Sequence, residues 1–479
     1  MLHSTLSSQP TKYFFTFRRS SSPPALVEGK ETVTVLIAGH VDHGKSTITG
    51  HLLVECNVVS EREMRKATKE AKELGKQSFN YAFLMDQNPE ERTHGVTIHL
   101  GAISLQTEER CVTLLDAPGH RDFVAAMIAG GLRADAGILV ISAQKGEFEA
   151  GWSTAGITKE HLLIMVGSGI ETLAILVNKM DTVHFSKLEA RFLEIQNTVI
   201  PYLKHLGFKR KNVTFIPTSG LEGVNLSTVD SKKTPWFTGP SLIHFLNSLS
   251  RTMVDSDVAN TKEVVMTVHD VYRGDMMGDC IAAHVARGFL DSRDLKPLIL
   301  LPAKLPLTVK SFLVNNHKAT VASAGNNVVL ITAGIDLASV SRGNVITTTT
   351  CPMKPSNRII AQIFVNKEAD MPIMKGLTVL LHLDGNVVSA VIQHVLAQVD
   401  FAGNVQKAKP KVVYGGQWAS VELALDREVF VADFKSIPAM SRFIMQDKGV
   451  TMGIGRVTEV KKSKFHRVWS VCLNKEYDE

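Results

Sequence analysis

The sequence predicts an α/β domain, with a mostly parallel sheet and helices on both faces, followed by two antiparallel β-barrel domains. At 479 residues the chain is too long for one hydrophobic core. From Glu31 to about Leu249, short apolar runs alternate with helical segments, as parallel strands joined by helices do. From Val264 onward helical periodicity nearly vanishes and β-branched runs follow at regular spacing, which predicts antiparallel barrels.

The elements of the first domain are expected in strict alternation. A charged segment that begins at Ser60, where Ser60 and Glu63 can form a capping box, is expected to add a further helix. The expected strands cover residues 32–39, 111–117, 136–143, 173–179 and 212–218. The expected helices cover residues 45–53, 121–132, 158–169 and 187–207.

The rest of the chain divides into two strand-rich units. Residues 251–263 have the composition of a linker, and the polar stretch 347–357 separates the two units. Expected strands cover residues 264–272, 326–336, 358–365, 377–383, 419–425 and 427–434. We therefore expect a disordered extension at 1–30, the α/β domain at 31–250, the barrels at 251–350 and 351–465, and a tail at 466–479.

Composition narrows the class of protein. Lys and Arg (53) exceed Asp and Glu (47) by six, a bias that permits a polyanionic partner without requiring one. The cysteines are odd in number and never form a CxxC pair, so they predict neither a disulfide framework nor a zinc site. No apolar run reaches the roughly 18 residues of a membrane-spanning helix. A reducing compartment, most simply the cytoplasm, is expected.

The first 27 residues leave two alternatives open. They contain no acidic residue, several serines, and Lys12, Arg18 and Arg19, which is compatible with a mitochondrial transit peptide. A disordered, trimmed or mis-started tail has the same composition, because Pro, Ser and Gln cannot bury enough apolar surface to become ordered.

The stretch "LIAGHVDHGKSTITGHLL" contains Gly39, then Gly44, Lys45 and Ser46, between an expected strand and an expected helix. This context is typical of a phosphate-binding loop, whose backbone N–H groups converge on phosphate oxygens. Lys45 would reach the β and γ phosphates, and Ser46 would ligate Mg²⁺. A metal site at His40 and His43 is disfavoured, because glycines flank both and no third ligand is nearby.

Three further motifs each follow an expected strand, at the sheet edge where ligands of such folds bind. "LLDAPGH" offers Asp116 for Mg²⁺ through a water molecule and the N–H of Gly119 for a γ-phosphate, and is followed by His120. "LVNKMD" contributes a carboxylate that can accept both guanine N1 and N2 protons, and "FIPTSG" a backbone that can meet guanine O6. The predicted nucleotide-binding residues of these two motifs, with the flanking positions included, are Asn178, Lys179, Asp181, Ser219, Gly220 and Leu221. From the phosphate loop we add Asp42, His43 and Thr47.

The motifs "GHVDHGKST", "ERTHGVTI", "DAPGHRDF", "NKMD" and "TSG" resemble the five nucleotide-binding elements of translational GTPases of the elongation factor Tu and elongation factor 1-alpha superfamily. The resemblance covers about residues 31 to 460. It implies a P-loop GTPase domain with two barrels, GTP/GDP and Mg²⁺ as ligands, and hydrolysis stimulated by the ribosome. It also implies that His120 orients the attacking water, that Val41 and Val96 form a hydrophobic gate, and that Thr97 joins Ser46 as a Mg²⁺ ligand.

Three roles within this family stay open. "AGNNVVLITAGID" and "MPIMKGLTVLLH" most resemble the GTPase that rescues stalled ribosomes with Pelota. Elongation factor 1-alpha carrying aminoacyl-tRNA and the GTPase subunit of the termination factor, with a release-factor-like partner, are the alternatives. A GTP-binding regulatory scaffold without hydrolysis is a fourth. The chain alone is expected to be monomeric.

Several positions depart from the family pattern. His94 stands where another basic residue is usual. The usual G-R-V-E-x-G of the second domain is Ala283-His284-Val285-Ala286-Arg287-Gly288, which lacks the glutamate. These departures weaken the case for recognition of an aminoacyl end. His43 is the residue usual in bacterial factor Tu, whereas the charged segment from Ser60 resembles an insertion of the eukaryotic and archaeal branch.

Overall fold

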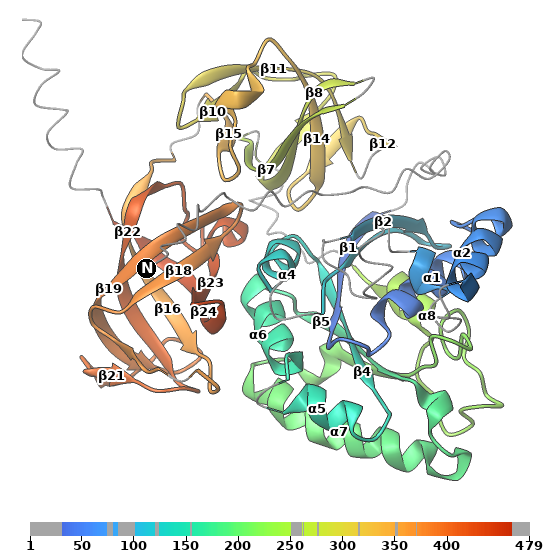
Figure 1. Ribbon diagram of the computed structural model, residues 1–479. Helices are drawn as coiled ribbons and strands as arrows, with labels where there is room; N and C mark the ends of the chain where they lie inside the picture. The colour runs from blue at the N-terminus through green and yellow to red at the C-terminus, as the bar shows by residue number, and fades with distance from the viewer. Residues whose placement is uncertain are drawn as a thin grey trace, which may run out of the picture.

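The chain forms an α/β domain and two closed β-barrels (Figure 1). The structure is a computed structural model. It describes residues 31–73, 80–84, 101–119, 124–153, 156–250, 261, 263–274, 277–314, 317–349, 353–369 and 371–461. His120, Val96, Thr97 and His94 lie outside the described residues, as does the extension at 1–30. No helix in the described ranges is long and apolar enough to cross a membrane.

The first domain is built on a six-stranded sheet in the order β2-β3-β1-β4-β5-β6. All neighbouring strands run parallel except β2 and β3, which are antiparallel. The strands are β1 (Glu31–Gly39), β2 (Gly101–Gln106), β3 (Arg110–Asp116), β4 (Ala136–Ser142), β5 (Thr172–Asn178) and β6 (Val213–Pro217). The edge strand β2 is an addition to the predicted strands.

Helices cover both faces of this sheet because the strand residues alternate between two buried cores. On β1, for example, Val35 and Ile37 pack into one core, while Leu36 and Ala38 pack into the other. The first core is completed by α1 (Lys45–Glu55), α2 (Glu61–Glu73) and α8 (Leu242–Ser248). The second is completed by α4 (Val124–Gly131), α5 (Glu147–Trp152), α6 (Thr158–Ser168) and α7 (Leu188–His205).

The predicted capping box of α2 is present. The backbone N–H of Ser60 donates to the Glu63 carboxylate over 2.9 Å, and the Glu63 N–H donates to the Ser60 hydroxyl over 3.3 Å. Such reciprocal bonds satisfy backbone donors that the first helical turn leaves open. Ala67 and Ala71, one turn apart, are the buried residues of this helix.

The second domain is a closed antiparallel barrel. The strands run in the order β10-β15-β7-β8-β14-β11, and β10 pairs with β11 to close it. They are β7 (Val265–Gly274), β8 (Gly278–Arg287), β10 (Leu298–Leu301), β11 (Leu305–Val314), β14 (Asn327–Ala333) and β15 (Val345–Thr348). Short strands β9 (Phe289–Asp291), β12 (His317–Lys318) and β13 (Val321–Ser323) lie beside it.

The third domain is a second closed barrel, in the order β18-β23-β24-β16-β22-β19, with β18 pairing with β19. Its strands are β16 (Ser356–Val365), β18 (Thr378–Leu383), β19 (Asn386–Val399), β22 (Trp418–Val429), β23 (Arg442–Asp447) and β24 (Val450–Val460). The short strand β20 (Val405–Ala408) pairs with β19, and β17 (Ile373–Met374) and β21 (Val412–Val413) form a separate two-stranded sheet.

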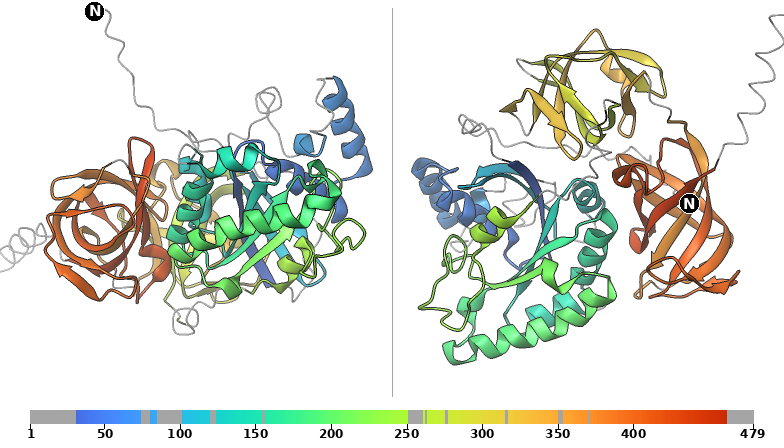
Figure 2. Two further views of the ribbon diagram at one scale, coloured as in Figure 1. Left: turned by 90° about the horizontal axis from the view of Figure 1, so that it is seen from below. Right: turned by 180° about the vertical axis from the view of Figure 1, so that it is seen from behind.

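The third domain packs against α6 of the first (Figures 1 and 2). Ile444 and Ile454 belong to the same buried cluster as the α6 side of the sheet. A Cβ atom at Gly167 would lie 2.4 Å from Ile454 Cγ2, so the helix needs a glycine at this contact. The Lys159 ammonium donates to the Glu368 carboxylate over 2.7 Å at the rim of the interface. The two domains are therefore held by an apolar contact with a polar edge.

Candidate nucleotide-binding site

The loop between β1 and α1 folds back sharply, and the left-handed residues in it explain why it is rich in glycine. Gly44, the N-cap of α1, has φ 89°, and Asp42 has φ 62°. At Gly39 a Cβ atom would lie 2.3 Å from the carbonyl oxygen of Val140, so a side chain cannot fit. The loop thus leads into the positive end of an eleven-residue helix, the arrangement that attracts phosphate.

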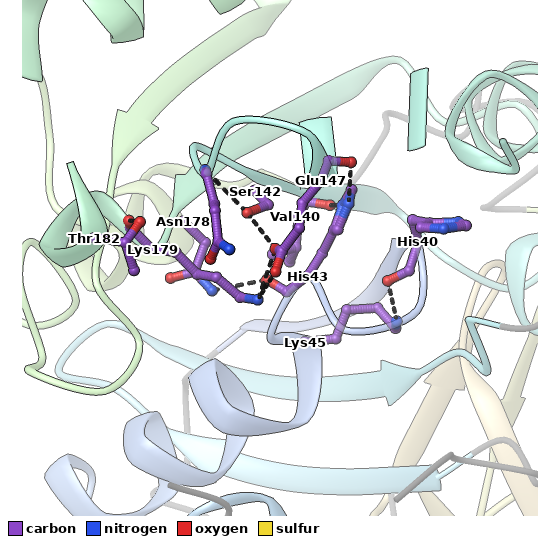
Figure 3. Close-up of polar contacts among 10 residues, drawn as sticks. His40, His43, Lys45, Val140, Ser142, Glu147, Asn178, Lys179 and Thr182 are labelled. Carbon is purple, nitrogen blue, oxygen red and sulfur yellow. Dashed lines mark hydrogen bonds and ion pairs between the residues drawn. The ribbon is translucent and has the colours of Figure 1, made fainter. Parts of the chain in front are cut away.

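Lys45, Ser46, Asp116 and Gly119 come together at the carboxyl ends of β1 and β3. The Ser46 hydroxyl donates to the Asp116 carboxylate over 3.3 Å. The Lys45 ammonium donates to the carbonyl oxygen of His40 over 3.0 Å, so it lies folded over the loop (Figure 3). A Cβ at Gly119 would lie 2.4 Å from Lys45 Nζ. Only glycine leaves this space open beside the Lys45 ammonium.

The electrostatics of this cluster suit an anion. Burial lowers the pKa of Lys45 from its ordinary value, and the carboxylates of Asp116 and Asp42 partly oppose that shift. Desolvation disfavours the charged form of an amine, so a bound anion next to Lys45 would compensate the buried cation. The residues present therefore fit a nucleotide phosphate, with Ser46 and Asp116 placed to hold its Mg²⁺ ion.

Asn178 at the end of β5 connects the phosphate loop to the loop after β6. Its Nδ2 donates to the carbonyl oxygen of His43 over 2.8 Å, and its Oδ1 accepts from the Gly220 N–H over 2.8 Å. The side chain is buried, with 2% of its surface exposed. Each end of the carboxamide thus makes one bond inside the protein, so Asn178 holds the two loops together.

The remaining predicted base-contacting residues lie around this bridge. Lys179 has φ 61°, and Asp181 follows it at the exposed surface in a short 3-10 helix. Ser219 is fully buried, whereas 46% of Leu221 is exposed. A backbone bond from Met180 N–H to the Thr218 carbonyl oxygen, 3.1 Å long, holds the two loops side by side. Val41 and Thr47 of the phosphate loop are half-buried.

His43 is predicted to contact nucleotide, but the structure turns its ring away from the loop opening. Its Nδ1 lies 3.2 Å from the Val140 carbonyl oxygen and its Nε2 lies 3.3 Å from that of Glu147. A Cβ at Gly151 would lie 2.7 Å from the ring, so the imidazole fills the space between β4 and α5 (Figure 3). The ring is therefore not placed to contact a nucleotide. Burial, with Lys45 and His40 adding to it, lowers the pKa of His43 to about 4.

Two residues absent from the prediction complete the site. Glu147 at the start of α5 accepts from Lys179 Nζ over 2.7 Å and from the Ser142 hydroxyl over 2.7 Å. Burial alone would raise the pKa of Glu147, but the bonds from Lys179 and Ser142 outweigh it and lower the pKa. On the other side of the site, Nδ1 of His51 lies 2.7 Å from the Gly220 carbonyl oxygen. No local motif marks either residue, since Lys179 is 32 positions from Glu147 and Gly220 is 169 positions from His51.

Comparison with known proteins identifies the family to which this chain belongs. A model of the elongation factor Tu GTP binding domain matches residues 30–277, and one described as GTP-eEF1A C-terminal domain-like matches residues 358–458. The chain belongs to the elongation factor Tu and 1-alpha family of translational GTPases. Elongation factor 1-alpha of Thermofilum pendens is 36% identical over 438 residues, covering 91% of this chain and 99% of that protein.

A second relative comes from another branch of the family. Protein HBS1 of Drosophila melanogaster is 35% identical over 435 residues, which are 90% of this chain and 64% of HBS1. Among solved structures, the S. cerevisiae Ski7 GTPase-like domain, bound to GDP and inorganic phosphate, matches with a TM-score of 0.70 and 19% identity, covering 90% of this chain and 97% of that one. The elongation factor SelB of Methanococcus maripaludis matches with a TM-score of 0.63 and 20% identity over 91% of this chain and 81% of that one. These two likenesses establish the fold.

The family and the geometry agree on the chemistry. The chain is a GTPase of the translational class that takes GTP or GDP with Mg²⁺. When bound, the Mg²⁺ ion neutralises charge on the transferred phosphate. Lys45 and the backbone from Gly39 to Gly44 surround the place for the phosphates, and Asn178 aligns this loop with that of Gly220.

Proposed function

We propose that this translational GTPase delivers a protein partner to the decoding site of stalled ribosomes, as the Pelota-partner branch of its family does. In this proposal it acts in the cytoplasm as a monomer that binds the ribosome and a Pelota-like protein. The relatives alone do not select this role, since elongation factor 1-alpha and HBS1 are equally similar in identity. The second domain supplies the argument.

The observation that carries the proposal is the replacement of the charged motif on β8. Where the family pattern has arginine and glutamate, this chain has His284 and Ala286, which are 6% and 4% exposed. The arginine that follows, Arg287, lies 3.6 Å from the Glu263 carboxylate and is engaged within the domain. The positions that would meet an aminoacyl end therefore offer no exposed charge, which favours a protein as the cargo.

Within the proposal, hydrolysis depends on alignment more than on strong acid–base chemistry. Phosphoryl transfer needs mainly positioning and charge stabilisation. Lys45 and the Gly119 N–H would bind the phosphates, and His120, which follows Gly119 directly, would orient the attacking water. The ribosome would bring His120 past Val41 and Val96, so the isolated protein should hydrolyse GTP slowly.

A competition pull-down tests the partner. The full chain, loaded with a non-hydrolysable GTP analogue, is offered Pelota, termination factor 1 and aminoacyl-tRNA together. Selective retention of Pelota is expected, because the second domain lacks the charged motif. Exclusive retention of aminoacyl-tRNA would instead assign the elongation role, and retention of termination factor 1 the termination role. GDP-loaded protein serves as the control for nucleotide dependence.

A further inference from the structure

Three buried side chains meet where the second and third domains join. His269 lies on β7, His284 on the neighbouring β8, and Asp384 in the turn between β18 and β19. Their exposed fractions are 6%, 6% and 5%. Such a set of polar groups away from water needs partners that satisfy it.

The polar atoms of this cluster point at one another. His269 Nε2 lies 3.3 Å from Asp384 Oδ1, and His284 Nδ1 lies 3.8 Å from Asp384 Oδ2. All four atoms are buried, and within the described part of the chain none has a hydrogen bond of normal geometry. One potential ligand atom from each of the three residues lies within 4.8 Å of the other two. The cluster therefore brings together imidazole nitrogens and carboxylate oxygens that could all bind one ion.

These separations resemble those of a zinc site. Zinc takes imidazole nitrogen and carboxylate oxygen at about 2.0–2.2 Å, so two ligand atoms at tetrahedral angles lie roughly 3.3–3.5 Å apart. The 3.3 Å from His269 to Oδ1 lies in that range, and the 3.8 Å from His284 to Oδ2 lies just above it. With one atom taken from each residue, all separations are within 4.8 Å, so the three side chains would close up by about 1 Å around an ion. Two imidazoles and one carboxylate also form a ligand set that zinc commonly uses, with a fourth position for water.

The backbone around the cluster is tightly placed, so the ligands are held in advance. A Cβ at Gly385 would lie 2.9 Å from the carbonyl oxygen of Val268, which shows how closely the β18–β19 turn approaches β7. Asn386 Nδ2 donates to the Gly343 carbonyl oxygen over 3.0 Å and ties the same turn to the second domain. Ligands held by packed backbone lose little freedom when an ion binds.

Other charges near the cluster set limits on the ion's affinity. Arg342 is paired with Asp270 over 3.1 Å. The Arg133 guanidinium of the first domain is also buried, and the negative charge of Asp384 acts on it electrostatically. This cation opposes a second positive charge, so we expect weaker binding than at a cysteine-rich structural site.

We propose that His269, His284 and Asp384 form a binding site for a divalent transition metal, best fitted by Zn²⁺, that joins the two barrel domains. The ion adds a link between two domains that also share a buried apolar cluster, in which Val265 and Ala286 pack with Ile437 and Met440. The site lies between strands β7 and β8 and the β18–β19 turn, away from the nucleotide loops. Ion binding at this site is independent of GTP hydrolysis. Its effect is to hold the second and third domains as one unit.

The test uses the full chain, freed of metal and saturated with GDP and Mg²⁺ so that the phosphate loop is occupied. Zn²⁺ is added and bound metal is counted after gel filtration, and Co²⁺ is added in parallel to record its absorption spectrum. One equivalent of Zn²⁺ and a tetrahedral Co²⁺ spectrum are expected. Asp384→Asn and His284→Asn should each weaken Zn²⁺ binding by about 100-fold or more.

A matched control variant and a direct measurement of the ligand shell show whether these three residues bind the ion. His394→Asn removes an exposed histidine of the third-domain barrel, which also contains Asp384. This variant should leave Zn²⁺ binding unchanged. If a ligand variant fails to fold, X-ray absorption on the wild-type zinc form still reports two imidazoles and one carboxylate if the proposal holds. No stoichiometric binding, binding that survives both ligand substitutions, or a ligand shell without imidazole would overturn it.

Discussion

Replacing Asn178 with alanine tests the bridge between the nucleotide loops. The substitution removes two hydrogen bonds of 2.8 Å and leaves the His43 carbonyl and the Gly220 N–H without their partner. Each buried polar group left unpaired costs about 1–3 kcal/mol. Some water will enter the space, so we expect a loss of about 2–4 kcal/mol in the free energy of GDP binding. That loss corresponds to roughly a 30- to 1,000-fold rise in Kd.

The assay is a fluorescence titration with a labelled GDP, combined with hydrogen exchange at the Gly220 amide. In Asn178→Ala this amide should exchange much faster, because it loses its acceptor. Asn197→Ala, an exposed asparagine of α7, is the matched control and should change Kd by less than about twofold. A well-folded Asn178→Ala protein whose Kd for GDP rises less than about threefold would refute the bridging role.

Three further predictions concern the same site. Gly119→Ala should weaken GTP at least about tenfold while sparing GDP, because its Cβ would lie 2.4 Å from Lys45 Nζ beside the γ-phosphate position; equal losses for both nucleotides in paired titrations would contradict this. With its pKa at about 4, below the ordinary value near 6.5 that it regains on unfolding, His43 should reduce stability by up to roughly 3 kcal/mol as pH falls through that window; an NMR titration showing His43 charged at about pH 5.5 would refute it. Glu147→Gln should weaken GDP binding by a few-fold, because Lys179 keeps an oxygen acceptor but loses the negative charge that lies 2.7 Å away. The exposed Glu189→Gln on α7 is the control, and an unchanged Kd would show that Lys179 needs no such charge.

Much of the fold follows from patterns that act over short distances. The alternation along β1 predicts a strand buried on both faces, and the Ser60–Glu63 box predicts the start of α2. The edge strand β2 was missed because "GAISLQ" is short and only partly apolar, and its place depends on pairing with β3. Closure of the barrels likewise depends on pairs such as β10 with β11, which no single segment specifies.

The candidate site likewise contains residues that motifs predict and residues that only tertiary contacts place there. Lys45, Ser46 and Asp116 belong to motifs whose spacing carries the chemistry, so the sequence predicts where they meet. Glu147 is different, because its partner Lys179 is 32 positions away. The motif that contains Lys179 does not indicate that Glu147 lies beside it. The place of His43 also depends on tertiary packing, since its ring fills a space made by β4 and α5.

The central claim is that this chain is a GTPase activated on the ribosome through His120. The most direct test compares GTP hydrolysis by wild type and His120→Ala at saturating GTP, with and without ribosomes stalled at an empty decoding site. We predict slow hydrolysis by both isolated proteins and strong stimulation of wild type alone, with equal GTP affinity for the two. Equal rates for wild type and His120→Ala on the ribosome, or fast hydrolysis without it, would contradict the account.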